Sequence, residues 1–143
     1  AEKFNQPIGG WDTSKVTDMG YVFSESKNFN QPLNWNTSKV TDMEFMFSIA
    51  KSFNQPLDWN TSKVTDMESM FRDATSFNQP LNWDTSNVTE IRYMFQNATS
   101  FNQNISNWIV SNVAYYTDFA TDSALTRANA PAKNGTKFPT TKP

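Results

Sequence analysis

The 143-residue sequence contains neither cysteine nor histidine. The lack of cysteine excludes a disulfide framework, and the lack of both residues excludes a Cys/His metal site. A catalytic nucleophile–base pair built on either residue is excluded for the same reason. No apolar run reaches the roughly 18 residues that a membrane-spanning helix needs, so we expect no membrane insertion.

The formal net charge is only −2, which by itself indicates no class of partner. The charges are unevenly distributed, because the residues after Asp122 include four basic and no acidic side chains. Residues 1–122 therefore carry eight basic against 14 acidic residues, a net charge of −6. Since nucleic-acid binding needs a basic face, this acidic body argues against a nucleic-acid partner.

Aromatic residues recur at a fixed spacing along almost the whole chain. Phenylalanines follow one another at intervals of 24, with the first of them 25 residues ahead of the second: Phe4, Phe29, Phe53, Phe77 and Phe101. Self-similarity at this period is typical of proteins built by stacking repeats. The chain begins inside a repeat, just before Phe4, so we expect it to be a piece of a longer protein.

Each repeat contains a pattern that predicts a short helix. In residues 41–50, Thr41 and Glu44 have the spacing of a capping box. The apolar residues that follow fall at i, i+3, i+4 and i+7, the spacing of one helix face: Met43, Met46, Phe47 and Ala50. A helix of two turns is not stable alone, so neighbouring repeats must cover its apolar face.

The remainder of each repeat reads as extended chain. Pro56 disfavours helix at Gln55, and residues 60–65 are rich in β-branched side chains, which predicts a short strand with Val64 turned inward. Stacked strands would form a continuous parallel ladder, either at the Ser-Lys-Val-Thr column or at the Phe-Asn-Gln column. The repeated Asn and Gln after each Phe predict a ladder of side-chain amides that satisfies buried turn backbone, with ligand binding as the alternative.

The motif FNQPLxWxTSKVTDMxxMF, which covers about residues 4–119, closely resembles the repeat of bacterial BspA-like leucine-rich-repeat surface proteins. The resemblance implies an α/β solenoid of the leucine-rich-repeat type on the outside of a cell, often within a large adhesin. It implies no catalytic residues. We therefore expect an α/β, leucine-rich-repeat-like right-handed solenoid of about five 24-residue coils, with one short helix and one short strand per coil.

We expect a single solenoid domain over residues 1–132, with coils starting near residues 4, 29, 53, 77 and 101. The degraded last repeat predicts a C-terminal cap near residues 113–132, because terminal repeats must cover an apolar end. Residues 133–143 are rich in Gly, Pro, Thr and Lys, which predicts a linker or tail.

Acidic residues form a column at the start of the expected helices: Asp18, Asp42, Asp66 and Glu90. A calcium site would need several oxygens converging on one point. These acids instead suit helix N-termini, and lysines lie three residues before the first three of them, which predicts caps and surface ion pairs. We expect no metal and no cofactor. We also expect no enzyme, because every prominent acid belongs to the repeat.

One variable column carries aromatic residues where solvent-facing polar residues are expected, namely Tyr21, Phe45 and Tyr93, with Ser69 between the last two. Ile49 follows Phe45 by four residues on the same expected helix. A row of exposed aromatic residues usually marks an interface, so we predict a binding site at Tyr21, Phe45, Tyr93 and Ile49. The alternative is that neighbouring Lys and Arg side chains partly cover the rings.

The function predicted from these features is that of an extracellular binding module of a bacterial surface adhesin. The expected partner is a protein, including an identical module in a homodimer. Two alternatives stay open. One is a purely structural spacer within a large adhesin, and the other is a carbohydrate-binding module that uses the exposed aromatic residues.

Overall fold

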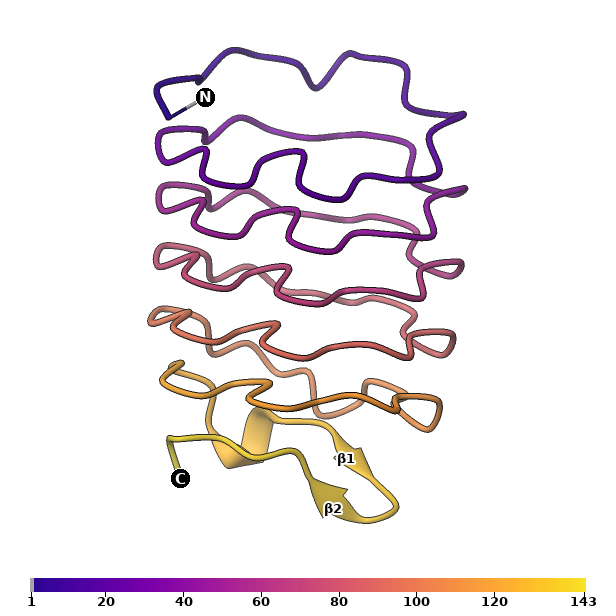
Figure 1. Ribbon diagram of the computed structural model, residues 1–143, viewed down its shortest axis with the longest axis vertical. Coiled ribbons are helices and arrows are strands. Elements are labelled where there is room, and N and C mark those ends of the chain that lie inside the picture. Colours follow the sequence, from indigo (N-terminus) through magenta and orange to yellow (C-terminus); the bar gives the residue numbers. More distant parts are fainter. Residues whose placement is uncertain (1) are drawn as a thin grey trace.

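The computed structural model describes residues 2–143, which stack as successive turns of the chain along the long axis of the molecule (Figure 1). Each repeat forms one layer of the stack. We number the layers 1 to 5 in chain order, as residues 4–28, 29–52, 53–76, 77–100 and 101–124. No helix among residues 2–143 is long and apolar enough to cross a membrane.

Regular secondary structure in residues 2–143 is confined to three short elements near the C-terminus. They are the 3-10 helix η1 (Arg127–Asn129) and the strands β1 (Ala132–Lys133) and β2 (Thr136–Lys137). The two strands pair antiparallel. The predicted α/β solenoid, with one helix and one strand in every coil, is therefore wrong.

Overlapping tight turns replace each expected helix. In layer 2, the Met46 N–H donates to the Met43 carbonyl at 3.3 Å, and the Ala50 N–H donates to the Phe47 carbonyl at 3.0 Å. Phe45 and Ile49 have φ of 55° and 60°, in the left-handed region that a right-handed helix never visits. These four-residue turns bring apolar residues to one side every three or four residues, so they reproduce the sequence pattern of a helix face.

Alternate amides of this segment bond to the next layer instead of within the helix that was expected. The N–H groups of alternate residues in layer 2 donate to layer 3 carbonyls at 2.8–3.0 Å: Met43 to Asp66, Phe45 to Glu68, Phe47 to Met70 and Ile49 to Arg72. Such interlayer bonds recur between the other layers, so the backbone itself joins the layers.

The predicted capping box is not formed. The Glu44 N–H donates to the Asp42 carboxylate at 2.8 Å, whereas the Thr41 hydroxyl donates to the Thr17 carbonyl one layer earlier at 3.2 Å. Threonine thus joins layers, and aspartate closes a local turn, a role for which its short acceptor side chain is suited.

The predicted strand over residues 60–65 is also wrong, because the segment turns. The Val64 N–H donates to the Thr61 carbonyl at 3.0 Å, and the Asn60 side chain accepts from the Ser62 N–H at 3.0 Å. Val64 is nevertheless fully buried, as expected. In place of the predicted parallel ladder, isolated parallel bridges connect the acidic residues of successive layers, for example Asp42 and Asp66.

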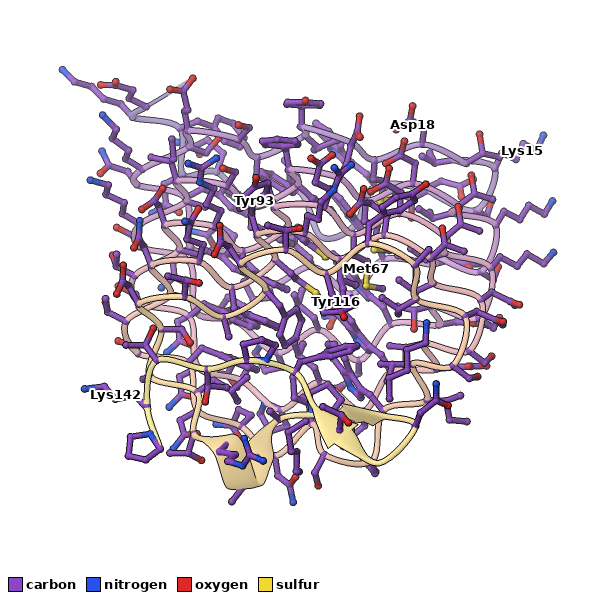
Figure 2. The ribbon with its side chains drawn as sticks, turned by 60° about the horizontal axis from the view of Figure 1, so that its bottom comes forward. Lys15, Asp18, Met67, Tyr93, Tyr116 and Lys142 are labelled. Atoms are coloured by element: carbon purple, nitrogen blue, oxygen red, sulfur yellow. The ribbon has the colours of Figure 1, made fainter. Side chains whose placement is uncertain are left out.

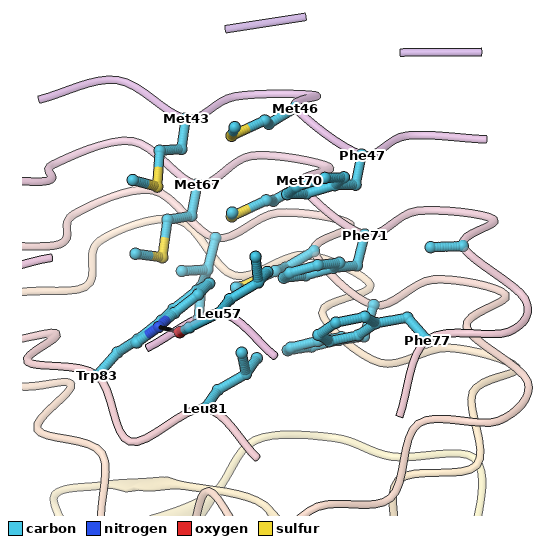
Figure 3. Packing of buried hydrophobic residues seen from close by; sticks show 14 of the residues in the cluster. Met43, Met46, Phe47, Leu57, Met67, Met70, Phe71, Phe77, Leu81 and Trp83 are labelled. Carbon is cyan, nitrogen blue, oxygen red and sulfur yellow. Dashed lines mark hydrogen bonds between the residues drawn. The ribbon is translucent and has the colours of Figure 1, made fainter. Parts of the chain in front are cut away.

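The core consists of like side chains stacked in register (Figure 3). Phe47 lies on Phe71 with ring centroids 5.6 Å apart and planes 4° apart. The Trp83 indole N–H donates to the Leu57 carbonyl of the previous layer at 2.9 Å, and the equivalent bond recurs at Trp35, Trp59 and Trp108. Burying the methionine, phenylalanine and tryptophan columns compensates for the absence of regular helices and strands.

The predicted ladder of side-chain amides is present along one edge of the stack. The Asn30 side-chain oxygen accepts the Asn54 N–H at 2.9 Å and the Gln55 side-chain amide at 3.1 Å. The same two bonds occur at Asn5, Asn54 and Asn78. The ladder is exposed, so it ties the layers together at the surface and does not satisfy buried backbone as predicted.

Residues 125–143 cover the end of layer 5, and part of this segment makes the same hydrogen bonds that a further repeat would make. The Thr126 N–H and the Asn129 side-chain amide both donate to the Asn102 side-chain oxygen at 3.0 Å, as Asn and Gln do in the layers before. The segment for which the sequence predicts a linker, residues 133–143, packs here. It contributes β2 and buries Phe138, whose ring meets Phe119 edge-on at 5.6 Å.

Candidate binding surface

The left-handed turns place the predicted site residues on the outside of the stack. Tyr21, Phe45 and Tyr93, which we call the aromatic stripe, have φ of 63°, 55° and 59°. Ile49 occupies the second left-handed position of layer 2, with φ of 60°. Bulky and β-branched residues rarely adopt this conformation, because the Cβ approaches the following carbonyl oxygen.

Two members of the stripe form a stacked pair. The Tyr21 and Phe45 rings lie with centroids 4.7 Å apart and planes 5° apart. Tyr21 keeps 54% of its surface exposed, whereas Phe45, Ile49 and Tyr93 are half-buried. The structure therefore brings two of the predicted aromatic residues into direct contact at the surface.

The third aromatic residue, Tyr93, is separated from this pair by Ser69. The Ser69 side chain is buried, and its hydroxyl has no hydrogen-bond partner within residues 2–143. The Arg72 guanidinium lies over the Tyr93 ring, 5.5 Å from its centroid. Cover by a basic side chain, the alternative considered from the sequence, is thus present at Tyr93.

Carboxylates line one side of the stripe, and we call Asp42, Glu44, Asp66 and Glu68 the acidic flank. Burial raises the pKa of Glu44, and the negative charges of Asp42 and Asp66 raise it further. Burial is also the main cause of the raised pKa values of Asp66 and Glu68. The Tyr21 pKa is raised as well, first by desolvation and then by nearby carboxylates such as Glu44.

The predicted ion pairs between the lysine column and these acids do not form in the part of the chain that the structure describes. Its salt bridges are Lys27–Glu2, Arg72–Asp73 and Arg92–Glu90. The first residue of the lysine column, Lys15, points outward from the molecule (Figure 2). None of these bridges involves the acidic flank.

Three acids of the flank could approach one cation. Asp42, Glu44 and Asp66 each offer a carboxylate oxygen, and these oxygens lie within 4.8 Å of one another. Two of the carboxylates already accept backbone N–H groups, at 2.8 Å for Asp42 and 2.9 Å for Asp66. A hard divalent cation bound here would need water to complete its coordination.

Apolar residues are also exposed outside the stripe, and the exposed Tyr115 was missed from the sequence. Trp11 and Val22 in layer 1 are 63% and 48% exposed, although their columns are buried in later layers. Tyr115 is exposed and lies under the Arg92 guanidinium, whose central carbon is 5.0 Å from the ring centroid. The bridge from Glu90 to Tyr115 shows that Tyr115 takes the place of an acid, and this break in the column was the available signal.

A hollow of about 400 Å³ lies beside the C-terminal strands and includes Tyr116, Lys133, Lys137 and Phe138 in its lining. The lysine amines are engaged in the fold. Lys133 donates to the Val113 carbonyl, and Lys137 donates to the Ala130 carbonyl at 2.6 Å. These interactions hold the C-terminal segment in place, so we assign the hollow no binding role.

The layers, each built from one 24-residue repeat, make this a repeat protein. The chain belongs to the family described as "Mycoplasma protein of unknown function, DUF285", whose profile matches residues 1–58 and again residues 33–132. This membership supports the bacterial, repetitive character expected from the motif. Comparison with curated proteins and with solved structures finds no match to either.

Proposed function

We propose that the chain is an extracellular, BspA-like binding module of a bacterial surface adhesin, and that the aromatic stripe contacts partner proteins. The resemblance of the motif to surface-protein repeats supports the location. The family supports only the bacterial repeat character and names no function. The case for the site therefore depends on the stripe and the acidic flank.

The observation that carries the proposal is the placement of large apolar residues at left-handed backbone positions on the surface. Asp73 and Asn97 occupy the same turn position as Ile49 in later layers, and such short polar residues adopt it readily. A bulky or β-branched residue there costs on the order of 1–2 kcal/mol. Strain of this kind is concentrated at functional sites, where the side chain has a use outside the fold. A plain spacer has no need for Ile49 or Phe45 at these positions.

The neighbouring charges favour a basic partner. The acidic flank attracts cations, and exposed aromatic rings accept guanidinium groups on their faces. The molecule contains this contact in Arg72 over Tyr93. A partner surface that presents arginine together with aromatic side chains suits both features, and arginine and aromatic residues are enriched at protein interfaces.

A second copy of the chain is the other protein partner that the sequence suggests. If two stripes pair in antiparallel order about a twofold axis, the acidic flank of each copy faces the acidic flank of the other. Like charges brought together in this way oppose association at neutral pH. Self-association through the stripe should therefore be weak at neutral pH and become stronger as the carboxylates are protonated.

The test selects peptides from a random display library on the immobilised chain. Enriched peptides should carry arginine and aromatic residues, and they should bind the double variant Phe45→Ser with Tyr93→Ser at least about tenfold more weakly, a loss of about 1.4 kcal/mol. Ile109→Ser, which removes an exposed apolar side chain outside the stripe, is the matched control and should leave binding unchanged.

Peptides that bind the double variant as well as the wild type would place the binding surface elsewhere. A glycan array provides the comparison for the carbohydrate alternative. If the wild type binds glycans, the double variant does not, and no peptide is enriched, then the ligand of the stripe is a carbohydrate and not a protein.

A further inference from the structure

The aromatic stripe lacks one ring, and the gap lies in layer 3. The stripe position holds Tyr21, Phe45 and Tyr93 in layers 1, 2 and 4, but Ser69 in layer 3. Ser69 has the same left-handed backbone as its neighbours, with φ of 53°, so the smaller side chain leaves the turn unchanged. Where rings occupy successive layers, as Tyr21 and Phe45 do, their centroids are 4.7 Å apart. Layer 3 therefore leaves a ring-sized position between Phe45 and Tyr93.

The buried phenylalanine column shows that a ring fits between rings of layers 2 and 4. Phe71 is the layer 3 member of that column. Its ring stacks on Phe47 and on Phe95, with centroids 5.6 and 5.5 Å away and planes 4° and 3° apart. A ring that enters the stripe in layer 3 has neighbours on both sides in the same register, so it can stack on both of them.

The Arg72 side chain fills this position in the free protein. Arg72 belongs to layer 3, and its guanidinium carbon is 5.5 Å from the Tyr93 ring centroid. Ser69 is fully buried although its side chain is small, so neighbouring side chains cover it. Layer 2 has the reverse arrangement, with the large Phe45 in the stripe and Ser48 at the place of Arg72. We call the position the aromatic slot and define it by Phe45, Ser69, Arg72 and Tyr93.

The guanidinium is held in the slot by weak interactions. The Arg72 Nε lies 3.8 Å from the Asp73 carboxylate, and both side chains are partly exposed, so this ion pair contributes little. The same Nε is buried and has no hydrogen-bond partner within residues 2–143. The contact with Tyr93 is made at a half-exposed ring, where a cation–π interaction is also weak. Little opposes the departure of this side chain.

Unpaired polar atoms gather beside the slot. Within residues 2–143, the buried side-chain atoms without a hydrogen-bond partner are Ser69 Oγ, Arg72 Nε and Gln96 Oε1. They belong to equivalent turns of layers 3 and 4, in which the N–H of Arg72 donates to the Ser69 carbonyl and that of Gln96 to the Tyr93 carbonyl, both at 3.2 Å. Buried polar groups are normally paired, so the slot is poorly satisfied while the guanidinium occupies it.

We propose that an aromatic side chain of the partner protein enters the aromatic slot, displaces the Arg72 guanidinium and stacks between Phe45 and Tyr93. This inference rests on the proposed function and names the group that the stripe selects. A partner arginine in the slot would only exchange one guanidinium for another. A ring gains stacking on two faces and burial of its apolar surface, and it releases Arg72 Nε to water. The arginine of such a partner is left to the acidic flank.

The direct test titrates N-acetyl-L-tyrosine methylamide, an uncharged probe, into the isotope-labelled intact chain and follows it by NMR. The amide signals of Ser69, Arg72 and Tyr93 should shift saturably, with a dissociation constant in roughly the millimolar range for a ligand of this size. The Tyr93 ring displaces the signals of the Arg72 side chain, and this displacement should disappear as the probe binds. N-acetyl-L-leucine methylamide, which has no ring, should produce neither effect.

Two variants copy combinations that layer 2 already contains, so both should fold. Arg72→Ser opens the slot and should bind the probe at least about threefold more tightly, because no side chain has to leave first. Ser69→Phe with Arg72→Ser fills the slot with a ring of the protein and should lose saturable binding there. Arg127→Ser, at an exposed arginine outside the stripe, is the matched control and should stay within about twofold of the wild type.

Three results would overturn the inference. Weaker probe binding to Arg72→Ser would show that Arg72 contacts the ligand and does not merely hold its place. Equal binding to Arg72→Ser and to the filled double variant would place the ring elsewhere on the stripe. Binding to Arg72→Ser with none to the wild type at about 50 mM would show that the guanidinium does not leave the slot.

The peptides selected by display separate this inference from the proposed function. Peptides that require Phe45 and Tyr93, yet bind Ser69→Phe with Arg72→Ser as tightly as the wild type, would refute the slot and retain the stripe. If the probe binds in the slot while no selected peptide depends on Phe45 and Tyr93, the occupant is a free aromatic ligand, which contradicts a side chain of a protein partner.

Discussion

The Phe47 ring lies parallel to the Phe71 ring, with centroids 5.6 Å apart and planes 4° apart, although 24 residues separate them. Phe71 also stacks on Phe77 at 4.3 Å and on Phe95 at 5.5 Å. The centre of the stack is therefore a continuous column of rings, and each ring supports those of the layers on both sides.

Removing one ring from this column should be costly. Phe71→Ala should lower the free energy of unfolding by about 3–5 kcal/mol, measured by denaturant melts, because it deletes a fully buried aromatic side chain and leaves a cavity. The control Ile109→Ala changes an exposed residue and should stay within about 0.5 kcal/mol of the wild type. A loss below about 1 kcal/mol for Phe71→Ala would show that the layers are not in this register.

The acidic flank should make the protein more stable at mildly acidic pH. The pKa values of Glu44, Asp66 and Glu68 are raised above the ordinary 4.5, 3.8 and 4.5, so the folded state binds these protons more tightly than the unfolded chain does. Stability is then lost as the pH rises from the ordinary values through the raised ones. The unfolding temperature should be a few degrees higher at about pH 5 than at about pH 7.5.

The double variant Glu44→Gln with Glu68→Gln should raise the unfolding temperature at neutral pH and remove most of this dependence. Asp58→Asn, at an exposed acid outside the flank, is the control. Asp12 and Asp84 affect stability in a different pH range. Hydrogen bonds from Ser14 and Ser86 lower the pKa values of these two carboxylates, so their contribution to stability is lost only as the pH falls below about 3.8. Higher stability at neutral than at mildly acidic pH would refute repulsion within the flank.

Folding should not require a divalent cation. The carboxylates of Asp42 and Asp66 are engaged by backbone N–H groups of their own turns, so the layers are closed without an ion. Addition of a chelator should change the unfolding temperature by less than about 2 °C in a calorimetric scan. A fall of tens of degrees would show that Asp42, Glu44 and Asp66 act together as ligands.

Self-association through the stripe should be visible by sedimentation velocity at high micromolar concentration, with a larger dimer fraction at about pH 5 than at about pH 7.5. A stable pair would bury on the order of 1,200–2,000 Å². The double variant Phe45→Ser with Tyr93→Ser should sediment as a monomer. A dimer that survives this change would place the contact outside the stripe and contradict the assignment.

Sequence reasoning could predict the features that depend on which residues repeat. The period, the buried columns and the Asn–Gln amide ladder follow from spacing alone, because like residues in successive repeats meet when the repeats stack. The aromatic stripe could be predicted from the residues that do not repeat. Tyr21, Phe45 and Tyr93 occupy a variable column, and variable columns face outward.

The helices could not be excluded from the sequence, because Met43, Met46, Phe47 and Ala50 have the spacing that overlapping tight turns also produce. The turns lack their usual marker at Phe45, where glycine or asparagine would have signalled a left-handed residue. Asp73 and Asn97 carried part of that signal, but Ile49 in the same column obscured it.

The central claim is that the layers turn through left-handed positions and that a large apolar residue is kept there for its surface role at a cost to the fold. The stability of Ile49→Asn tests it most directly, because asparagine adopts a φ near 60° far more easily than isoleucine does. We predict that this substitution raises the free energy of unfolding by about 0.5–1 kcal/mol in denaturant melts. A fall of more than about 1 kcal/mol would show that Ile49 is held by packing in an unstrained backbone, and it would contradict the account.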